Sequence, residues 1–170
     1  MGIPLLVSMI QSDRERLQRL STERKEIVSD DGKIKVTVPA TWTKLPELNK
    51  QASLQVGNKS NEVYLIVITD TKADLDNFTF EKNHQQTRDR MLQKMKNASG
   101  TQPVSLMIDG HPALQDEISG TENGMNLVFL HTTLDDGNHF QQLLAWTLKS
   151  RWQKQNQQLR EVTASFRSVK

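Results

Sequence analysis

The sequence has no cysteine, few aromatic residues and almost no net charge. Its 170 residues include 22 Lys and Arg against 20 Asp and Glu, giving a formal net charge of +2, and aromatic residues make up 5%. The absence of cysteine excludes disulfide scaffolds, thiol catalysis and Cys-ligated zinc or iron–sulfur sites. The low charge and few aromatics argue against a nucleic-acid partner, because phosphate tracks are basic and single strands stack on aromatic rings.

Motifs for catalysis and phosphate binding are missing as well. The sequence contains no G-x-S-x-G elbow, no P-loop and no G-x-G-x-x-G turn, which are the usual signatures of a serine nucleophile or a bound nucleotide. The acidic pairs Asp30-Asp31 and Asp135-Asp136 fall in predicted turns, where solvated carboxylates are ordinary. The sequence therefore predicts a protein that is not an enzyme and holds no cofactor.

The N-terminus is apolar but short. The stretch from Met1 to Ile10 falls well below the roughly 20 residues that a membrane-spanning helix needs, and it lacks the basic start of a signal peptide. Apolar residues at helical spacing then predict an amphipathic helix from Ser8 to Lys25. We expect a helix or linker over residues 1–25, which leaves membrane proximity open, and a compact domain over residues 26–170.

The remaining sequence alternates between strand and helix patterns. Period-two alternation and Gly-containing turns predict strands at 34–38, 52–56, 63–68, 104–108, 113–119, 125–134 and 139–148. Helical spacing predicts a helix from Thr79 to Asn97, stopped by Ser99-Gly100, and a closing helix capped by Ser150. Tight turns make neighbouring strands antiparallel. We expect an α+β fold, an α/β/α sandwich whose central antiparallel sheet has about six to eight strands flanked by helices.

Histidines and a tryptophan are the candidate binding residues. His131 and His139 lie on adjacent predicted strands, and His111 follows the turn at Asp109-Gly110. The three are the candidates for a metal or small-ligand site, although none has a metal-binding spacing and ordinary hydrogen-bonded histidines explain them equally well. Trp42 is either a core anchor or part of a recognition surface.

Both ends of the predicted domain resemble a known superfamily. The run Ile34-Lys35-Val36-Thr37-Val38-Pro39-Ala40-Thr41-Trp42, the hairpin around Asp109-Gly110, and the ending Ala145-Trp146-Thr147 with Ser165-Phe166 are similar to the PsbP-like superfamily. This superfamily includes photosystem II extrinsic proteins, Ran-binding import factors and bacterial DcrB-like proteins. The chain looks most like its uncharacterised bacterial members.

The resemblance implies an α/β/α sandwich that acts by binding other proteins, often at membranes. We therefore expect a non-enzymatic protein-binding or accessory module with an unidentified protein partner. A place outside the cytoplasm or at the membrane periphery of a bacterium is favoured over the cytoplasm. The alternative is a small-ligand or metal-binding domain that uses the histidines of the sheet. The oligomeric state is left open.

Overall fold

The chain folds as an α+β protein with two antiparallel sheets. A computed structural model describes residues 3–72 and 78–170; Met1 and Gly2 of the predicted N-terminal segment, and residues 73–77 of the predicted domain, lie outside the described residues. The helices and strands are α1 Ile3–Thr22, β1 Arg24–Val28, β2 Ile34–Pro39, β3 Thr43–Lys44, β4 Leu54–Asn58, β5 Val63–Thr71, α2 Phe80–Lys94, β6 Lys96–Gly100, β7 Val104–Ile108, β8 His111–Glu122, β9 Met125–Asp135, β10 His139–Leu148, α3 Trp152–Ala164 and β11 Arg167–Ser168.

The large sheet has eight strands in the order β3-β4-β5-β10-β9-β8-β6, and β7 also pairs with β8. All of its neighbours are antiparallel. The small sheet has the order β1-β2-β11. This confirms the antiparallel sandwich that the turn pattern predicted. The small sheet is an addition to it, formed where residues just after α1 pair with β2.

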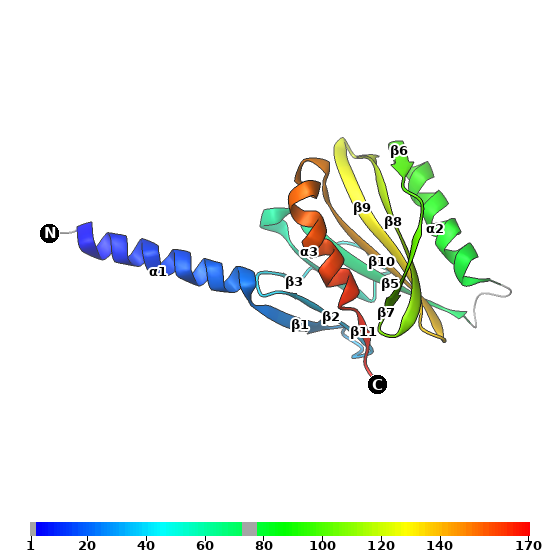
Figure 1. Cartoon of the computed structure of the whole chain (residues 1–170), viewed down its shortest axis with the longest axis horizontal. Helices are drawn as coiled ribbons and strands as arrows, with labels where there is room; N and C mark the ends of the chain where they lie inside the picture. The colour runs from blue at the N-terminus through cyan, green and yellow to red at the C-terminus, as the bar shows by residue number, and fades with distance from the viewer. Residues whose placement is uncertain (1–2, 73–77) are drawn as a thin grey trace.

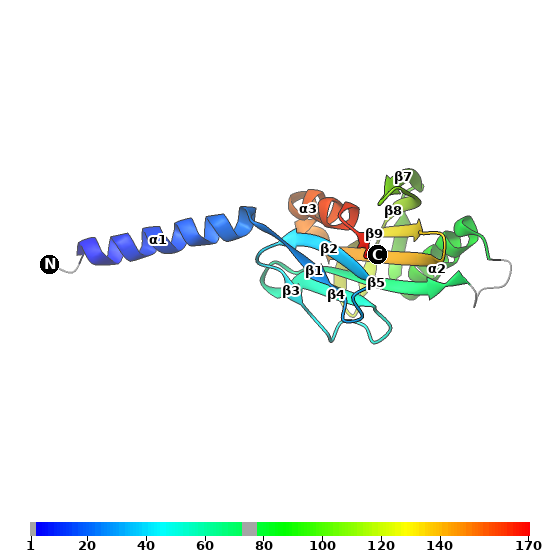
Figure 2. The same ribbon diagram turned by 90° about the horizontal axis from the view of Figure 1, so that it is seen from below.

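The two faces of the large sheet are covered differently. Helix α3 and the small sheet lie over one face, and α2 lies over the other (Figures 1 and 2). Odd-numbered residues of β5 and β10, such as Leu65 and Leu143, join the core with α3, whereas even-numbered Gln142 contacts α2 residue Asn83. The period of two along each strand therefore decides which layer a side chain enters.

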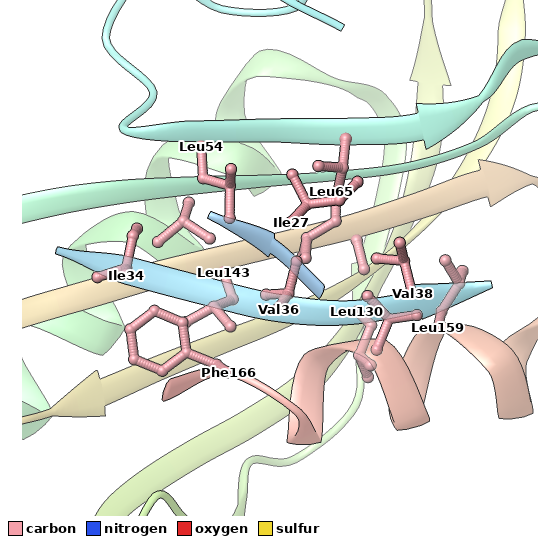
Figure 3. Close-up of a cluster of buried hydrophobic side chains, with 14 of the residues drawn as sticks. Ile27, Ile34, Val36, Val38, Leu54, Leu65, Leu130, Leu143, Leu159 and Phe166 are labelled. Atoms are coloured by element: carbon pink, nitrogen blue, oxygen red, sulfur yellow. The ribbon is translucent and has the colours of Figure 1, made fainter. Parts of the chain in front are cut away.

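The apolar core lies between the large sheet, the small sheet and α3. In Figure 3 the side chains of β2 point toward those of β5, β9 and β10, and α3 closes the cluster from below. Val36, Val38, Leu65 and Leu143 are fully buried. Burying each such side chain contributes roughly 1.5–3 kcal/mol to stability, so this layer holds the two sheets together.

Two helix ends differ from the sequence prediction. Helix α2 ends at Lys94, and Lys96–Gly100 forms β6 against β8, so the long strand β8 gives the backbone of this segment a partner that the helical pattern did not reveal. Ser150 does not cap α3 as predicted. It lies within a 3-10 turn at Lys149–Arg151, and α3 begins without a side-chain cap bond.

Helix α1 extends away from the rest of the molecule (Figures 1 and 2). It covers Ile3–Thr22, so it begins before the predicted Ser8 and ends before the predicted Lys25, which lies in β1. Of the elements that the structure describes, none lies beside its N-terminal half. Its apolar side chains thus have no intramolecular cover there.

Candidate functional site

One end of the core face changes from apolar to polar. Along the same face of β5 and β10, the buried apolar side chains are followed by polar ones: Val63, Leu65 and Val67 by Thr69 and Thr71, and Ala145 and Leu143 by Gln141 and His139. The strand pairs Thr69–Gln141 and Thr71–His139 lie directly opposite each other. The side chains between the two sheets are therefore apolar near α3 and polar where the two sheets end.

A pocket opens at this polar end, and we call it the polar pocket. Its volume is about 490 Å³, and it is lined by Asp31, Lys33, Ile34, Ser53, Thr69, Thr71, His111, Asp136, Asn138, His139, Gln141, Ser168, Val169 and Lys170. These residues come from the β1–β2 turn, the start of β8, the β9–β10 turn, strands β5 and β10, and the residues around β11. The size is within the range of pockets that take small molecules.

Hydrogen bonds cross the floor of the polar pocket in one chain. Ser53 Oγ donates to Thr69 Oγ1 over 3.0 Å, and Thr69 Oγ1 donates to Gln141 Oε1 over 2.6 Å. Gln141 Nε2 then donates to Asp136 Oδ2 over 3.0 Å. Gln141 is 2% exposed, so this chain fixes a buried amide in place at the bottom of the pocket.

Asp136 links that chain to His139. The carboxylate accepts hydrogen bonds from the backbone N–H groups of Asn138 and His139, and its Oδ1 lies 3.3 Å from His139 Nδ1. Burial raises the pKa of Asp136, but the hydrogen bonds from Gln141 and the backbone outweigh it and hold this pKa below its ordinary value. The Asp136 carboxylate is thus charged at neutral pH and already fully engaged.

A second polar cluster lies under α2 and is closed to solvent. Asp116 of β8 contacts both histidines, through Oδ2 to His84 Nε2 and through Oδ1 to His131 Nδ1, each over 2.8 Å. Arg88 of α2 donates to Asp116 Oδ2 over 2.7 Å. The two imidazoles stack with ring centroids 4.3 Å apart. We call these four residues, His84, Arg88, Asp116 and His131, the buried cluster.

Neighbouring side chains complete the hydrogen bonding of the buried cluster. His84 Nδ1 lies 2.7 Å from Thr133 Oγ1, and His131 Nε2 lies 3.0 Å from Gln142 Oε1. The Gln142 amide also bonds to Asn83 of α2. The only residues of α2 itself that are fully buried are Asn83 and His84. Polar contacts of these two buried residues therefore help to attach α2 to the sheet.

The buried cluster shifts the pKa values of its members. Burial lowers the pKa of His84, and the hydrogen bond with Asp116 opposes this only in part. Burial raises the pKa of Asp116, but the hydrogen bonds with His131 and His84 lower it further than burial raises it, so it lies far below its ordinary value. Asp116 is therefore charged across the physiological pH range, and His84 is neutral.

The nitrogen and oxygen atoms of His84, Asp116 and His131 lie within 4.8 Å of one another, close enough to share a metal ion. The Arg88 guanidinium, however, already donates to the same carboxylate oxygen as His84. A divalent cation at this place would meet a neighbouring positive charge. The cluster as it stands is better suited to holding α2 in place than to holding a metal.

The structure separates the three histidines that the sequence singled out. His111 and His139 line the polar pocket, whereas His131 lies in the buried cluster on the opposite face of the sheet. Trp42, the candidate for a recognition surface, is 1% exposed and belongs to the core. Its indole therefore packs among apolar side chains and lines no surface.

His84 and Asp116 were missed by sequence reasoning, although a signal for one of them was present. The two-residue turn Asn123-Gly124, which sets a hairpin register, places Asp116 directly opposite His131. The prediction spread this turn over residues 120–124, and so lost the register. His84 could not be assigned to the cluster, because only the packing of α2 on the sheet brings it there.

The N-terminal part of helix α1 is apolar and exposed, and we call it the apolar tip. The side chains of Leu5, Leu6, Val7, Met9 and Ile10 are 49–73% exposed. Arg14, Arg16 and Arg19 follow on the same helix. Among the described residues, no helix is both long enough and apolar enough to pass through a bilayer.

Known structures share this fold, although no family model and no curated protein matches the sequence. LpqN of Mycobacterium tuberculosis, described as involved in cell envelope biogenesis, superimposes with a TM-score of 0.61 at 16% identity over 87% of this chain and 91% of its own. The Ran-binding protein Mog1p of Saccharomyces cerevisiae gives 0.62 at 13% identity, over 86% and 96%.

Cyanobacterial PsbP from Synechocystis gives a TM-score of 0.58 at 14% identity, over 86% of this chain and 92% of its own. Each match spans nearly the whole of both chains, so the likeness is one of complete folds and not of a shared motif. The chain therefore has the PsbP-like fold, as the resemblance of its two ends predicted.

Proposed function

We propose that this chain is a non-enzymatic accessory module that binds a protein partner and is held at a membrane surface by α1. The observation that carries the proposal is the apolar tip of α1, which projects from the domain with its leucine, valine, methionine and isoleucine side chains in solvent. Soluble domains rarely leave so many large apolar side chains together in water.

The order of residues along α1 fits insertion into one leaflet. The tip from Ile3 to Ile10 is about 12 Å long at 1.5 Å per residue, which is less than half of the roughly 30 Å hydrocarbon layer. Arg14, Arg16 and Arg19 come next, at the depth where lipid headgroups lie. Each basic side chain near an anionic surface contributes about 1 kcal/mol to binding, and Asp13 and Glu15 on the same stretch oppose part of this attraction.

A surface for the protein partner is offered by β7. This strand pairs with β8 on one side, and in the described part of the chain it has no strand on its other side. Val104 and Met107 are 58% and 65% exposed on it. An extended segment of another protein can add to such an edge through backbone hydrogen bonds.

The comparisons support the coarse role. Mog1p is a Ran-binding protein and LpqN is involved in cell envelope biogenesis, so the same fold serves protein binding in one case and the envelope in another. A place outside the cytoplasm or at the membrane periphery agrees with LpqN. In this chain, the histidines and carboxylate of the buried cluster are engaged with one another and closed to solvent, which does not suit catalysis.

The membrane role is tested by flotation of the full chain with vesicles of phosphatidylcholine and phosphatidylglycerol. The unaltered chain should float, and the double variant Leu6→Glu/Ile10→Glu should not. The matched control Gln11→Glu/Ser12→Glu adds the same charge to exposed positions of the same helix that lie outside the tip, and it should still float. Equal flotation of both variants, or none of the unaltered chain, would overturn membrane attachment.

The protein-binding role is tested by photo-crosslinking in cells of the source organism. A crosslinker at Met107 of β7 should give one discrete adduct, which the charged variant Val104→Glu should remove. A crosslinker at exposed Lys59, on the turn after β4, is the control and should give none. Identical adduct patterns at Met107 and Lys59 would show that β7 is not a binding surface.

A second candidate function, a small-ligand or metal-binding domain, has one observation in its favour: His111 and His139 line the same pocket. Calorimetric titration with zinc and manganese tests the metal part. Heat at micromolar metal that disappears in His111→Gln would support it, and the absence of heat would remove it.

A further inference from the structure

We propose that the polar pocket binds a small organic anion that also carries hydroxyl groups. This inference rests on the second candidate function and is independent of the membrane role of α1. It names the class of ligand, which follows from the charged and hydrogen-bonding groups that the pocket leaves without partners.

The polar pocket is a built feature of the sandwich. Its floor is made by two paired strands of the large sheet, and its walls come from the small sheet and from the β9–β10 turn. The buried Gln141 amide is held by Thr69 on one side and Asp136 on the other. A buried amide fixed on both sides orients its neighbours, so the pocket keeps one arrangement of polar groups.

The carboxylates of the pocket already accept hydrogen bonds from the protein. Asp136 accepts hydrogen bonds from Gln141 and from two backbone N–H groups. Asp31 accepts from Ser29 Oγ over 2.6 Å and from the backbone N–H of Lys33 over 3.0 Å, and these bonds lower its pKa. Asp136 is thus engaged through both of its oxygens, whereas both bonds to Asp31 go to Oδ1.

Two basic side chains of the pocket differ from His139, which contacts Asp136. The side chains of Lys33 and His111 make no hydrogen bond or ion pair with any described residue, yet both line the pocket. A lysine ammonium has three donors, and a histidine ring can donate as well. The pocket therefore offers an incoming molecule the ammonium group of Lys33, which lies near the Asp31 carboxylate, and the ring nitrogens of His111.

Hydroxyl and amide groups line the same pocket as Lys33 and His111. Ser53 Oγ donates its proton to Thr69 and keeps lone pairs that can accept from a ligand hydroxyl. Gln141 Nε2 has a second proton beyond the one donated to Asp136. A ligand with an acidic group near Lys33 and hydroxyl groups near Ser53 and Gln141 would form hydrogen bonds with all three residues. The bond to Lys33 would be charge-assisted and therefore stronger than a bond between neutral groups.

The test is a titration of the ¹⁵N-labelled full chain, followed by amide shifts, with four probes. Glycerol 3-phosphate and citrate present the two kinds of acid, glycerol is the neutral analogue, and sodium chloride controls for ionic strength. At least one of the two anions should cause saturable shifts confined to residues of the polar pocket, and which of them does so identifies the acid. Glycerol and chloride should cause no such shifts.

Variants connect any binding to the proposed groups. Lys33→Gln and His111→Gln should each weaken binding about tenfold, the factor that corresponds to one charge-assisted hydrogen bond. Thr69→Val should also weaken it, because it breaks the chain to Gln141 while keeping side-chain volume. Lys59→Gln, which removes an exposed lysine outside the pocket, should bind like the unaltered chain.

The outcomes separate the two levels of the proposal. If glycerol shifts the pocket residues as strongly as the anions do, the pocket binds ligands but the choice of an anion is wrong. If no probe gives saturable shifts at millimolar concentration, both the anion proposal and the small-ligand function fail. If binding occurs but Lys33→Gln and His111→Gln leave the affinity unchanged, the anion is held elsewhere and the proposal is wrong.

Discussion

Replacing the carboxylate of the buried cluster, Asp116→Asn, should severely destabilise the protein. Asp116 and His131 have fully buried side chains, and Arg88 is 11% exposed. The carboxylate contacts nitrogen atoms of three residues, His84, Arg88 and His131. An asparagine amide keeps one acceptor oxygen there and turns an N–H₂ group toward donors, so Arg88 is left buried without its counter-charge.

The expected loss is about 3–5 kcal/mol, the usual cost of removing one partner from a buried ion pair. Domains of this size are stable by about 5–15 kcal/mol, so the change removes a large share of the total. With a urea m-value near 2 kcal/mol/M, the midpoint of unfolding should fall by about 2 M.

Urea unfolding at pH 7.5, followed by circular dichroism, measures this loss. The control is Asp89→Asn on the same helix, whose carboxylate accepts an exposed hydrogen bond from Gln85 and should change stability by less than about 0.5 kcal/mol. Equal stability of the two variants would contradict this prediction, because it would mean that the buried carboxylate contributes no more to the free energy of unfolding than an exposed one.

A double variant separates the ion pair from general damage. Adding Arg88→Met to Asp116→Asn removes the uncompensated cation, so the double variant should lose less stability than the sum of the two single variants. Strict additivity would show that Arg88 and Asp116 do not stabilise each other, in spite of the 2.7 Å contact.

Three further predictions follow from the pKa shifts and the packing. Stability should fall as the pH is lowered from 7.5 to 5, because the unfolded chain binds a proton at His84 near the ordinary pKa of 6.5. The folded chain, in which burial lowers the pKa of His84, does not. In thermal melts across this pH range, the free energy of unfolding should fall by up to about 1.4 kcal/mol per pH unit, and His84→Gln should reduce this slope. Trp42→Ala should lower the free energy of unfolding in urea by about 3–5 kcal/mol, because it leaves a cavity in the core. A much smaller loss would show that the Trp42 side chain is not packed in the core. Gly57→Ala should lower the melting temperature, because its Cβ would lie 2.5 Å from the Val63 carbonyl oxygen, while an unchanged melting temperature would show that β4 can shift away from β5.

Seven of the eleven strands that the structure describes could be predicted from the sequence alone, whereas β1, β3, β6 and β11 could not. Alternation along Ile34–Val38 and the turn before His139–Leu148 predicted strands that the structure contains at nearly the same bounds. Both signals are local, since the period of two follows from the pleat of a single strand. Likewise the Pro39 to Trp42 segment and the Ser165-Phe166 ending carried the resemblance to the PsbP-like fold, since both are local.

Which polar residues meet depends on how the helices and the two sheets pack. Lys96–Gly100 became β6 because a long neighbour, β8, was there to pair with. His84 contacts Asp116, and Asp116 contacts His131, because α2 packs on the face of the sheet opposite to α3. His111 and His139 line the same pocket because the two sheets end at the same place. Such contacts join residues far apart in the chain, and a single sequence records the period of each element but not the distance between them.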